Sequence, residues 1–261
     1  MSPESLVIGT AAAAAVASPL GGLIALWCRP TTLLMSLALG FASGVLLATI
    51  GFEMLPQALE LSSIALAAAG FVAGFAAVYG FDLFVHRGRL AGAKAEQLRQ
   101  VERFRRSHRP RGDEVTVLAG GTSVEELIGG LSIGVGAAIK PDLGLIVAFA
   151  IVIDNLAEAL SIGELIRSQS PQDRRGATWR ILRWTGLIGV SLFGSAMAGW
   201  FFLRGLPQPL LGFLFALGGG GMFYLVVTDL LPEAEERQYQ QSSALAVAAG
   251  FTAIFVIGHI G

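Results

Sequence analysis

Acidic residues interrupt a membrane-length apolar stretch, Ala148-Phe-Ala-Ile-Val-Ile-Asp154-Asn155-Leu-Ala-Glu158-Ala-Leu-Ser-Ile-Gly163. A second stretch has a similar arrangement, because Glu125 and Glu126 precede the related run Gly-Gly-Leu-Ser-Ile-Gly at 129–134. Ionisable side chains at membrane depth are expensive, and where they occur they usually mark a functional site. The two stretches therefore predict a pair of membrane-spanning helices that share one site.

The composition is that of an integral membrane protein. Of 261 residues, 54% are hydrophobic and only 14% are charged, which is more apolar than a soluble domain of this length requires. The single cysteine, Cys28, excludes an internal disulfide. The first ten residues lack the positive charges of a cleaved signal peptide, so we expect the N-terminal apolar stretch to be a retained helix.

Eight apolar windows of about 20 residues, the length that crosses a bilayer, can be placed along the chain. They cover residues 5–28, 33–57, 62–85, 115–138, 143–166, 184–204, 209–231 and 243–260. We expect an all-α membrane protein with eight transmembrane helices, forming a single transmembrane domain over residues 1–261.

Lys and Arg are distributed unevenly between the two sides of these windows. With the N-terminus outside, 16 of the 18 fall in cytoplasmic connections, and only Lys140 and Arg204 remain external. This asymmetry follows the positive-inside rule and predicts that both termini are extracytoplasmic. The polar segment 86–114 is then a basic cytoplasmic loop, which either serves orientation alone or has a regulatory or lipid-binding role.

Two similar words close the second and seventh windows: Glu53-Met54-Leu55-Pro56 and Asp229-Leu230-Leu231-Pro232. The acid stands three residues before the proline in both. Because these windows cross the membrane in opposite directions, the match predicts an inverted repeat of helices 1–3 and 6–8. Helices 4 and 5 then form a central antiparallel pair.

On the fifth helix, Asp154 and Glu158 are four residues apart and share a face, with Asn155 beside them. Charged acids at this depth need protons, a cation or hydrogen bonds to neutralise them. Carboxylate and amide oxygens suit Mn, Fe, Zn, Mg or Ca more than Cu(I). We therefore predict metal ligation by Glu125, Glu126, Asp154, Asn155 and Glu158. A proton or sodium path, or hydrogen-bonded packing, is the alternative.

Glu53 and Asp229 are weaker candidates, because they lie near the ends of their windows, where an acid costs little. We expect them to line a pathway rather than to form the central site.

At these residues the chain resembles the ZIP family of divalent metal transporters, the Zrt- and Irt-like proteins, over all eight windows. Asp154, Asn155 and Glu158 stand where the family's fifth helix has His, Asn and Glu. Glu125 and Glu126 match the His and Asn of the fourth helix. Gly129 replaces the family's bridging Glu, and both motifs lack their usual His and Pro.

The resemblance implies a carrier that brings a divalent transition metal (zinc, iron, manganese or cadmium) into the cytoplasm by an elevator-like or rocking movement, often as a homodimer. The metal is then the transported substrate, and no cofactor or enzymatic activity is expected. The expected partners are the metal ion and the lipid bilayer of the plasma or inner membrane, and nucleic acid is not among them. A proton- or sodium-coupled transporter of another solute is the alternative.

Overall fold

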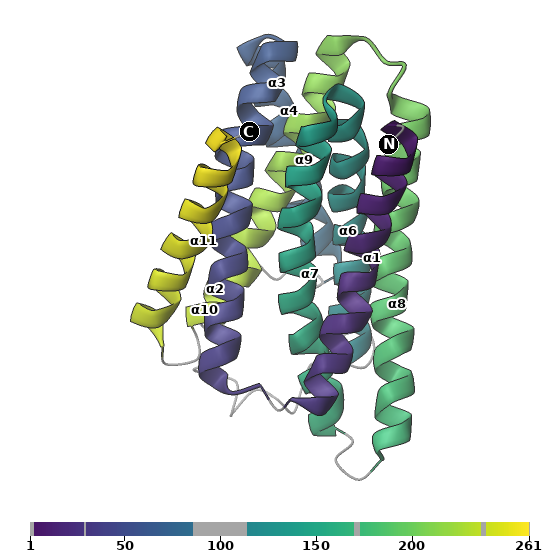
Figure 1. Cartoon of the computed structure of the whole chain (residues 1–261), viewed down its shortest axis with the longest axis vertical. Coiled ribbons are helices and arrows are strands. Elements are labelled where there is room, and N and C mark those ends of the chain that lie inside the picture. Colours follow the sequence, from purple (N-terminus) through teal and green to yellow (C-terminus); the bar gives the residue numbers. More distant parts are fainter. Residues whose placement is uncertain (1–2, 29, 86–113, 170–172, 236–238, 261) are drawn as a thin grey trace.

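The computed structural model describes residues 3–28, 30–85, 114–169, 173–235 and 239–260, and every regular element in these ranges is a helix (Figure 1). The expected all-α class is confirmed. The elements in chain order are α1 (Pro3–Trp27), α2 (Thr32–Ala48), η1 (Thr49–Met54), α3 (Leu55–Leu61), α4 (Ile64–Val85), α6 (Glu114–Ile139), α7 (Pro141–Gln169), α8 (Arg174–Ala198), η2 (Gly199–Leu203), α9 (Gln208–Leu225), η3 (Val226–Leu230), α10 (Leu231–Glu235) and α11 (Gln240–Ile260).

Seven helical segments in the described ranges are long and apolar enough to cross a membrane. α6, the predicted fourth span, is the eighth long helix and packs among α7, α8 and α9. Its polar residues and glycines lower its hydropathy, as the sequence indicated. The arrangement fits a multi-pass membrane protein whose two termini lie at the same end of the bundle (Figure 1).

The predicted start of the sixth span, residue 184, is wrong by ten residues. α8 begins at Arg174, because Asp173 caps it: the Asp173 carboxylate accepts a hydrogen bond from the Gly176 N–H at 2.8 Å. Hydropathy missed these first turns because they carry Arg174, Arg175, Arg180 and Arg183, which extend the helix beyond its apolar part.

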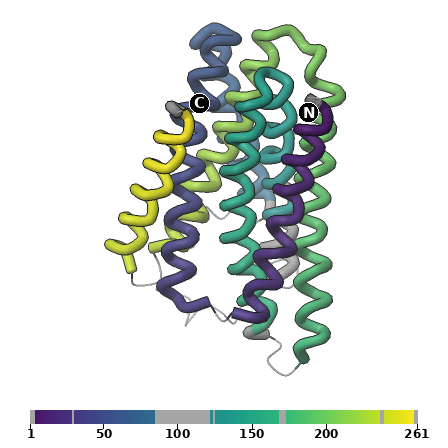
Figure 2. The backbone as a smooth tube through the Cα atoms, in the orientation of Figure 1, coloured from purple at the N-terminus to yellow at the C-terminus, as the bar shows by residue number. Residues whose placement is uncertain are grey.

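The helices form two groups, visible side by side in Figures 1 and 2. In the first bundle α1 packs on α7 and α8, and α6 packs on α8 and α7. In the second bundle α2 packs on α11, and α4 packs on α9. The bundles meet where α2 contacts α7 and where α6 contacts α9. The predicted repeat relates α1 to α8, α2 to α9, α4 to α11 and α6 to α7. The α1–α7 contact then corresponds to the α8–α6 contact, and the α2–α11 contact to the α9–α4 contact. The packing therefore fits the predicted inverted repeat.

Glycines bring helices into backbone contact within each bundle. A Cβ on Gly74 would overlap the Leu217 carbonyl oxygen, and one on Gly220 would overlap that of Phe71, so α4 and α9 touch through their backbones. α2 and α11 do the same through Gly44. Such close approach is how small residues hold membrane helices together.

Between the bundles, the glycines of α9 face side chains instead of backbone. A Cβ at Gly221 would meet the Ile128 side chain at 3.1 Å, and one at Gly218 would meet the Ser132 hydroxyl. Side chains can rearrange where backbones cannot. The structure thus has tightly joined pairs inside each bundle and a more adaptable contact between the bundles.

The two similar segments with an acid three residues before a proline, 53–56 and 229–232, each include the end of a π-helical turn. In η1 the Leu55 N–H bonds the Ile50 carbonyl, and in η3 the Leu231 N–H bonds the Val226 carbonyl, each five residues back. Pro56 and Pro232 follow directly, and a proline ring would clash with the carbonyl of an ordinary helical turn. The widened turns accommodate the prolines, and they present Glu53 and Asp229 at equivalent positions of the two halves.

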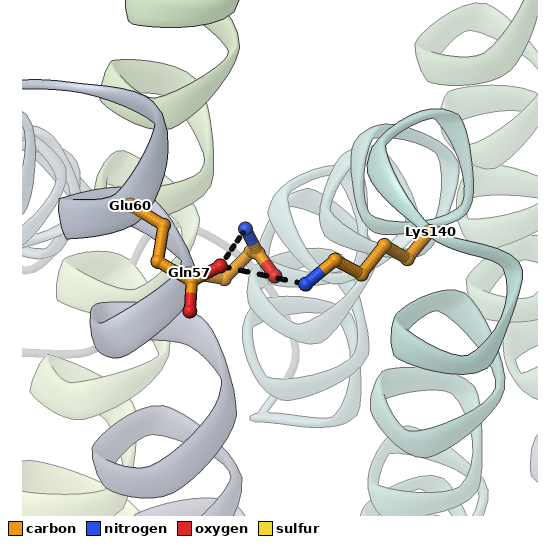
Figure 3. Close-up of polar contacts among 3 residues, drawn as sticks. All are labelled: Gln57, Glu60 and Lys140. Carbon is orange, nitrogen blue, oxygen red and sulfur yellow. Dashed lines mark hydrogen bonds and ion pairs between the residues drawn. The ribbon is translucent and has the colours of Figure 1, made fainter.

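A polar contact joins the two bundles (Figure 3), and its α3 side lies at the end where both termini are marked (Figure 1). Lys140, between α6 and α7, forms an ion pair with the Glu60 carboxylate of α3 at 3.4 Å, and Gln57 donates a hydrogen bond to the same oxygen at 3.0 Å. Glu60 and Lys140 are exposed, so this pair contributes less than about 1 kcal/mol to stability.

Replacing Gly74 by Ala tests the backbone contact between α4 and α9. The new methyl group has no space beside Leu217, and forcing extra atoms into a packed interface costs about 1–3 kcal/mol. We expect a lower midpoint of thermal unfolding in detergent. Gly80→Ala on the same helix is the control, because a Cβ there meets nothing within 4 Å. Equal midpoints for the two variants would contradict the close contact.

Candidate metal centre

Three acids from two neighbouring helices converge in the first bundle. One carboxylate oxygen each from Glu126 on α6 and from Asp154 and Glu158 on α7 lie within 4.8 Å of one another. Glu126 is buried, with 5% of its surface exposed, and the other two are partly buried. The i, i+4 spacing on α7 aligns Asp154 with Glu158, as the sequence predicted. The described residues hold no second such group of acids, His or Cys.

Glu125, which the sequence also predicted to be a ligand, is not one of the three converging acids. It is partly buried on α6, one residue round the helix from Glu126. It still lies near enough to Glu126 and Glu158 to repel them electrostatically. Glu125 therefore adds negative potential to the cluster, while Glu126 points its carboxylate at the α7 acids.

Asn155 links α7 to α6 and to α1. Its amide nitrogen donates to Glu126 Oε2 and to the Ala14 carbonyl of α1, both at 3.4 Å. The side chain is 1% exposed, yet its Oδ1 has no hydrogen-bond partner, and neither has the buried Oδ1 of Asp154. Buried polar atoms are nearly always paired. A bound cation would give a partner to both atoms, Oδ1 of Asp154 within the cluster and Oδ1 of Asn155 beside it.

Gly129 lies next to the Glu126 carboxylate. A Cβ on Gly129 would lie 3.6 Å from Glu126 Oε2 and 3.3 Å from the Ile151 side chain. Glu126 thus occupies the space beside this glycine, one helical turn along α6. The family resemblance indicated that an acid is missing at 129, but not that the Glu126 carboxylate lies beside this glycine.

The cluster has no basic residue beside it on its own helices. α6 contains no Lys or Arg, and the single one on α7, Arg167, donates to the Ala25 carbonyl at 2.8 Å. Two ionised carboxylates within 4.8 Å of each other repel by about 3 kcal/mol even at an effective dielectric constant of about 20. Lys and Arg of α6 and α7 therefore do not offset this repulsion, which a bound cation or protons would relieve.

The two lower-ranked acids lie in the second bundle. Glu53 is partly buried in η1 and packs against Gly258 of α11. Asp229, in η3, lies near enough to Glu158 to interact with it electrostatically. A third contact in this region had no signal in the sequence: Ser161 on α7 donates a hydrogen bond to Glu233 on α10 at 2.7 Å. Asp229 and Glu233 thus extend the acidic character from the cluster toward the end of the bundle opposite the termini.

The proposed basic loop at 86–114 lies outside the described residues, apart from Glu114 at the start of α6. Its predicted cytoplasmic position and its role stay predictions.

Comparison with known proteins identifies relatives over most of the chain. A protein of Salmonella heidelberg (strain SL476) named Zinc transporter ZupT is 25% identical over 229 residues, 86% of this chain and 84% of the relative. A protein of the same name from Escherichia coli O7:K1 (strain IAI39 / ExPEC) is 26% identical over the same length. No protein-family model matches the chain. The named relatives are transporters, in agreement with the expectation that the chain is not an enzyme.

Two substitutions of different size at Gly129 test whether the Glu126 carboxylate binds the metal. Gly129→Leu would displace the Glu126 carboxylate, whereas Gly129→Ala adds a methyl group that nearly fits. A bound metal stabilises the folded protein in proportion to the logarithm of its concentration divided by its Kd, so at saturation each tenfold loss of affinity removes about 1.4 kcal/mol of that stabilisation and lowers the unfolding midpoint. We expect the zinc-induced rise to be reduced strongly by Leu and little by Ala. An unchanged rise with Leu would show that Glu126 does not bind the metal.

Proposed function

Because the chain resembles the ZIP family along its length and its relatives are zinc transporters, we propose that it is a divergent ZIP-type carrier of divalent transition metals. It binds the ion between α6 and α7, the fourth and fifth membrane helices. Glu126, Asp154 and Glu158 act as ligands, and Asn155 orients Glu126 and offers a further oxygen. Zinc is the first metal to test, because it is named for the relatives.

The convergence of the three carboxylates is the observation that carries this proposal. Each central acid costs roughly 2.5–3.5 kcal/mol to insert into a bilayer, so a chain without use for the cluster would lose stability by keeping it. Hydrogen bonds do not offset the insertion cost at Asp154 Oδ1, because this atom has no partner. The neighbouring amide oxygen, Asn155 Oδ1, also has no partner. A divalent cation offsets two of the three negative charges at once and gives both oxygens a partner.

The division into two bundles supports the movement that the family resemblance implies. All three ligands stand on α6 and α7, inside the first bundle, so a displacement of that bundle carries the whole site with it. Glu53 and Asp229 stand on the second bundle, in π turns that the inverted repeat relates. In this proposal they assist metal entry and release at opposite ends of the path. Uptake into the cytoplasm and a homodimer stay predictions.

Metal uptake by purified protein in liposomes tests the proposal. Glu158→Gln keeps the side-chain shape but removes one ligand charge. We expect zinc uptake to fall at least tenfold, because residues that only orient metal ligands already cost about 10–100-fold. Asp142→Asn is the matched control, since Asp142 is an exposed acid in the first turn of the same helix.

Two results would contradict the proposal. One is the absence of uptake of zinc, iron, manganese and cadmium by the unmodified chain. The other is a proton or sodium flux that needs no metal and is lost in Glu158→Gln, which would favour the alternative of a transporter for another solute.

A further inference from the structure

The helix that begins at Arg174 is longer than a membrane crossing needs. α8 and η2 form one continuous helical segment of 30 residues, Arg174–Leu203, whereas about 20 residues cross the hydrocarbon core of a bilayer. About ten residues therefore extend beyond the core. Figure 1 shows the start of α8 reaching beyond the neighbouring ends of α2 and α11, at the end of the molecule opposite the termini.

An arginine and a tryptophan mark each end of the part that crosses the core. The Arg183 guanidinium lies 5.5 Å from the centre of the Trp184 ring, and the Arg204 guanidinium lies 5.5 Å from the centre of the Trp200 ring. Tryptophans gather at membrane interfaces, and the stretch between the two arginines has about 20 residues, the length of one crossing. The extra residues, 174–183, therefore lie at the level of the lipid headgroups.

One face of this extension is turned away from the bundle. Arg175, Trp179 and Arg183 follow one another at intervals of four residues, so they share a helix face. All three are exposed, and Trp179 exposes 71% of its surface. On the opposite face, Ala177 and Ile181 are buried against isoleucines of α7. This packing fixes the direction in which the two arginines and the tryptophan point.

The extension carries a strong positive charge. Its acid, Asp173, accepts a hydrogen bond from the Gly176 N–H and caps the helix. Within the described ranges, neither Arg175 nor Arg183 forms an ion pair. The arginines of the extension are Arg174, Arg175, Arg180 and Arg183.

Cations at the other end of the molecule have acidic partners in the chain. Lys140 forms an ion pair with Glu60, and Arg204 forms one with Glu4, each at 3.4 Å. The outward arginines of α8 differ from these two, because their charge is available to an anion from outside the chain.

The chemistry of the outward face matches an anionic phospholipid. A guanidinium group binds phosphate through two parallel hydrogen bonds, and basic residues at a membrane surface attract anionic lipids. The same helix face continues into the core with Leu187 and Val190, which expose 45% and 70% of their surfaces. Phosphate beside the arginines and acyl chains along these apolar residues would use the whole face, whereas a soluble anion would use only its charged part.

We infer that the outward face of α8 formed by Arg175, Trp179 and Arg183 is a docking surface for the headgroup of an anionic phospholipid, in the leaflet opposite the termini. The bound lipid holds the end of the first bundle, the one that contains the acidic cluster, in the headgroup layer. This inference does not depend on metal transport, because it follows from the length, charge and exposure of α8.

Lipid binding by the purified full chain in a neutral detergent gives the test. The protein is titrated with phosphatidylglycerol and, separately, with phosphatidylcholine of the same acyl chains, and the half-saturating concentration is read from the rise in the unfolding midpoint. Each basic residue near an anionic surface contributes about fivefold in affinity. We expect phosphatidylglycerol to half-saturate at a concentration at least about tenfold lower than phosphatidylcholine does.

The double variant Arg175→Gln/Arg183→Gln removes the two outward charges. Its half-saturating concentration for phosphatidylglycerol should rise at least about tenfold, while that for phosphatidylcholine should not change. Lys140→Gln/Arg204→Gln is the matched control, because it removes two positive charges that already have partners at the other end of the molecule. The control should keep the phosphatidylglycerol value of the unmodified chain.

Two measurements on the unmodified protein keep the test valid even where the arginine variant fails to fold. The preference for phosphatidylglycerol should shrink between 0.15 M and 1 M salt, because the screening length falls from about 8 Å to about 3 Å. Inorganic phosphate at the same concentrations should give no comparable rise, because it has no acyl chains.

Four results would overturn the inference. They are equal half-saturation by the two lipids, a phosphatidylglycerol preference that salt or the arginine variant leaves unchanged, the same loss of preference in the control variant, and a rise with inorganic phosphate as large as that with the lipid.

Discussion

Three carboxylates held within 4.8 Å inside a lipid-embedded bundle have to be neutralised, and the rest of the structure depends on this constraint. Glu126, Asp154 and Glu158 have no basic residue beside them on their own helices. Asn155 donates one hydrogen bond to Glu126. Two buried oxygens, Oδ1 of Asn155 and Oδ1 of Asp154, have no hydrogen-bond partner. A site of this kind is stable when an external positive charge occupies it, which is the property that a cation carrier needs.

The surrounding helices hold the acids together through small residues. Gly129 lies next to the Glu126 carboxylate on α6, and Gly21 brings α1 against the backbone of α7 at Leu156. Glycine contacts of the same type join α4 to α9 and α2 to α11 in the second bundle. The first bundle can therefore hold the ligands rigidly, while the side-chain contacts of α9 with α6 leave the two bundles able to shift against each other.

Much of the fold could be predicted from the sequence, because it depends on local patterns. Apolar windows located the long helices, and the words around Glu53 and Asp229 indicated the inverted repeat before any packing was known. The stacking of Asp154 on Glu158 followed from helical periodicity alone. The start of α8 could not be predicted from hydropathy, since its first turns are rich in arginine and depend on the Asp173 cap.

The finer geometry of the site depends on tertiary contacts that no local pattern contains. The sequence predicted both Glu125 and Glu126 as ligands. That the Glu126 carboxylate converges with the two acids of α7 depends on how α6 is rotated against α7. The contact between Asn155 and the Ala14 carbonyl spans 141 residues of chain. The π turns could be suspected from the prolines, but their widened hydrogen bonds appear only in the folded backbone.

Anomalous diffraction from crystals soaked in zinc locates the ion without assuming any ligand. One strong peak is expected between Glu126, Asp154 and Glu158, at about 2.0–2.2 Å from their carboxylate oxygens. A peak at Glu125, at Glu53 or elsewhere on the chain, with the space between the three carboxylates empty, would contradict it.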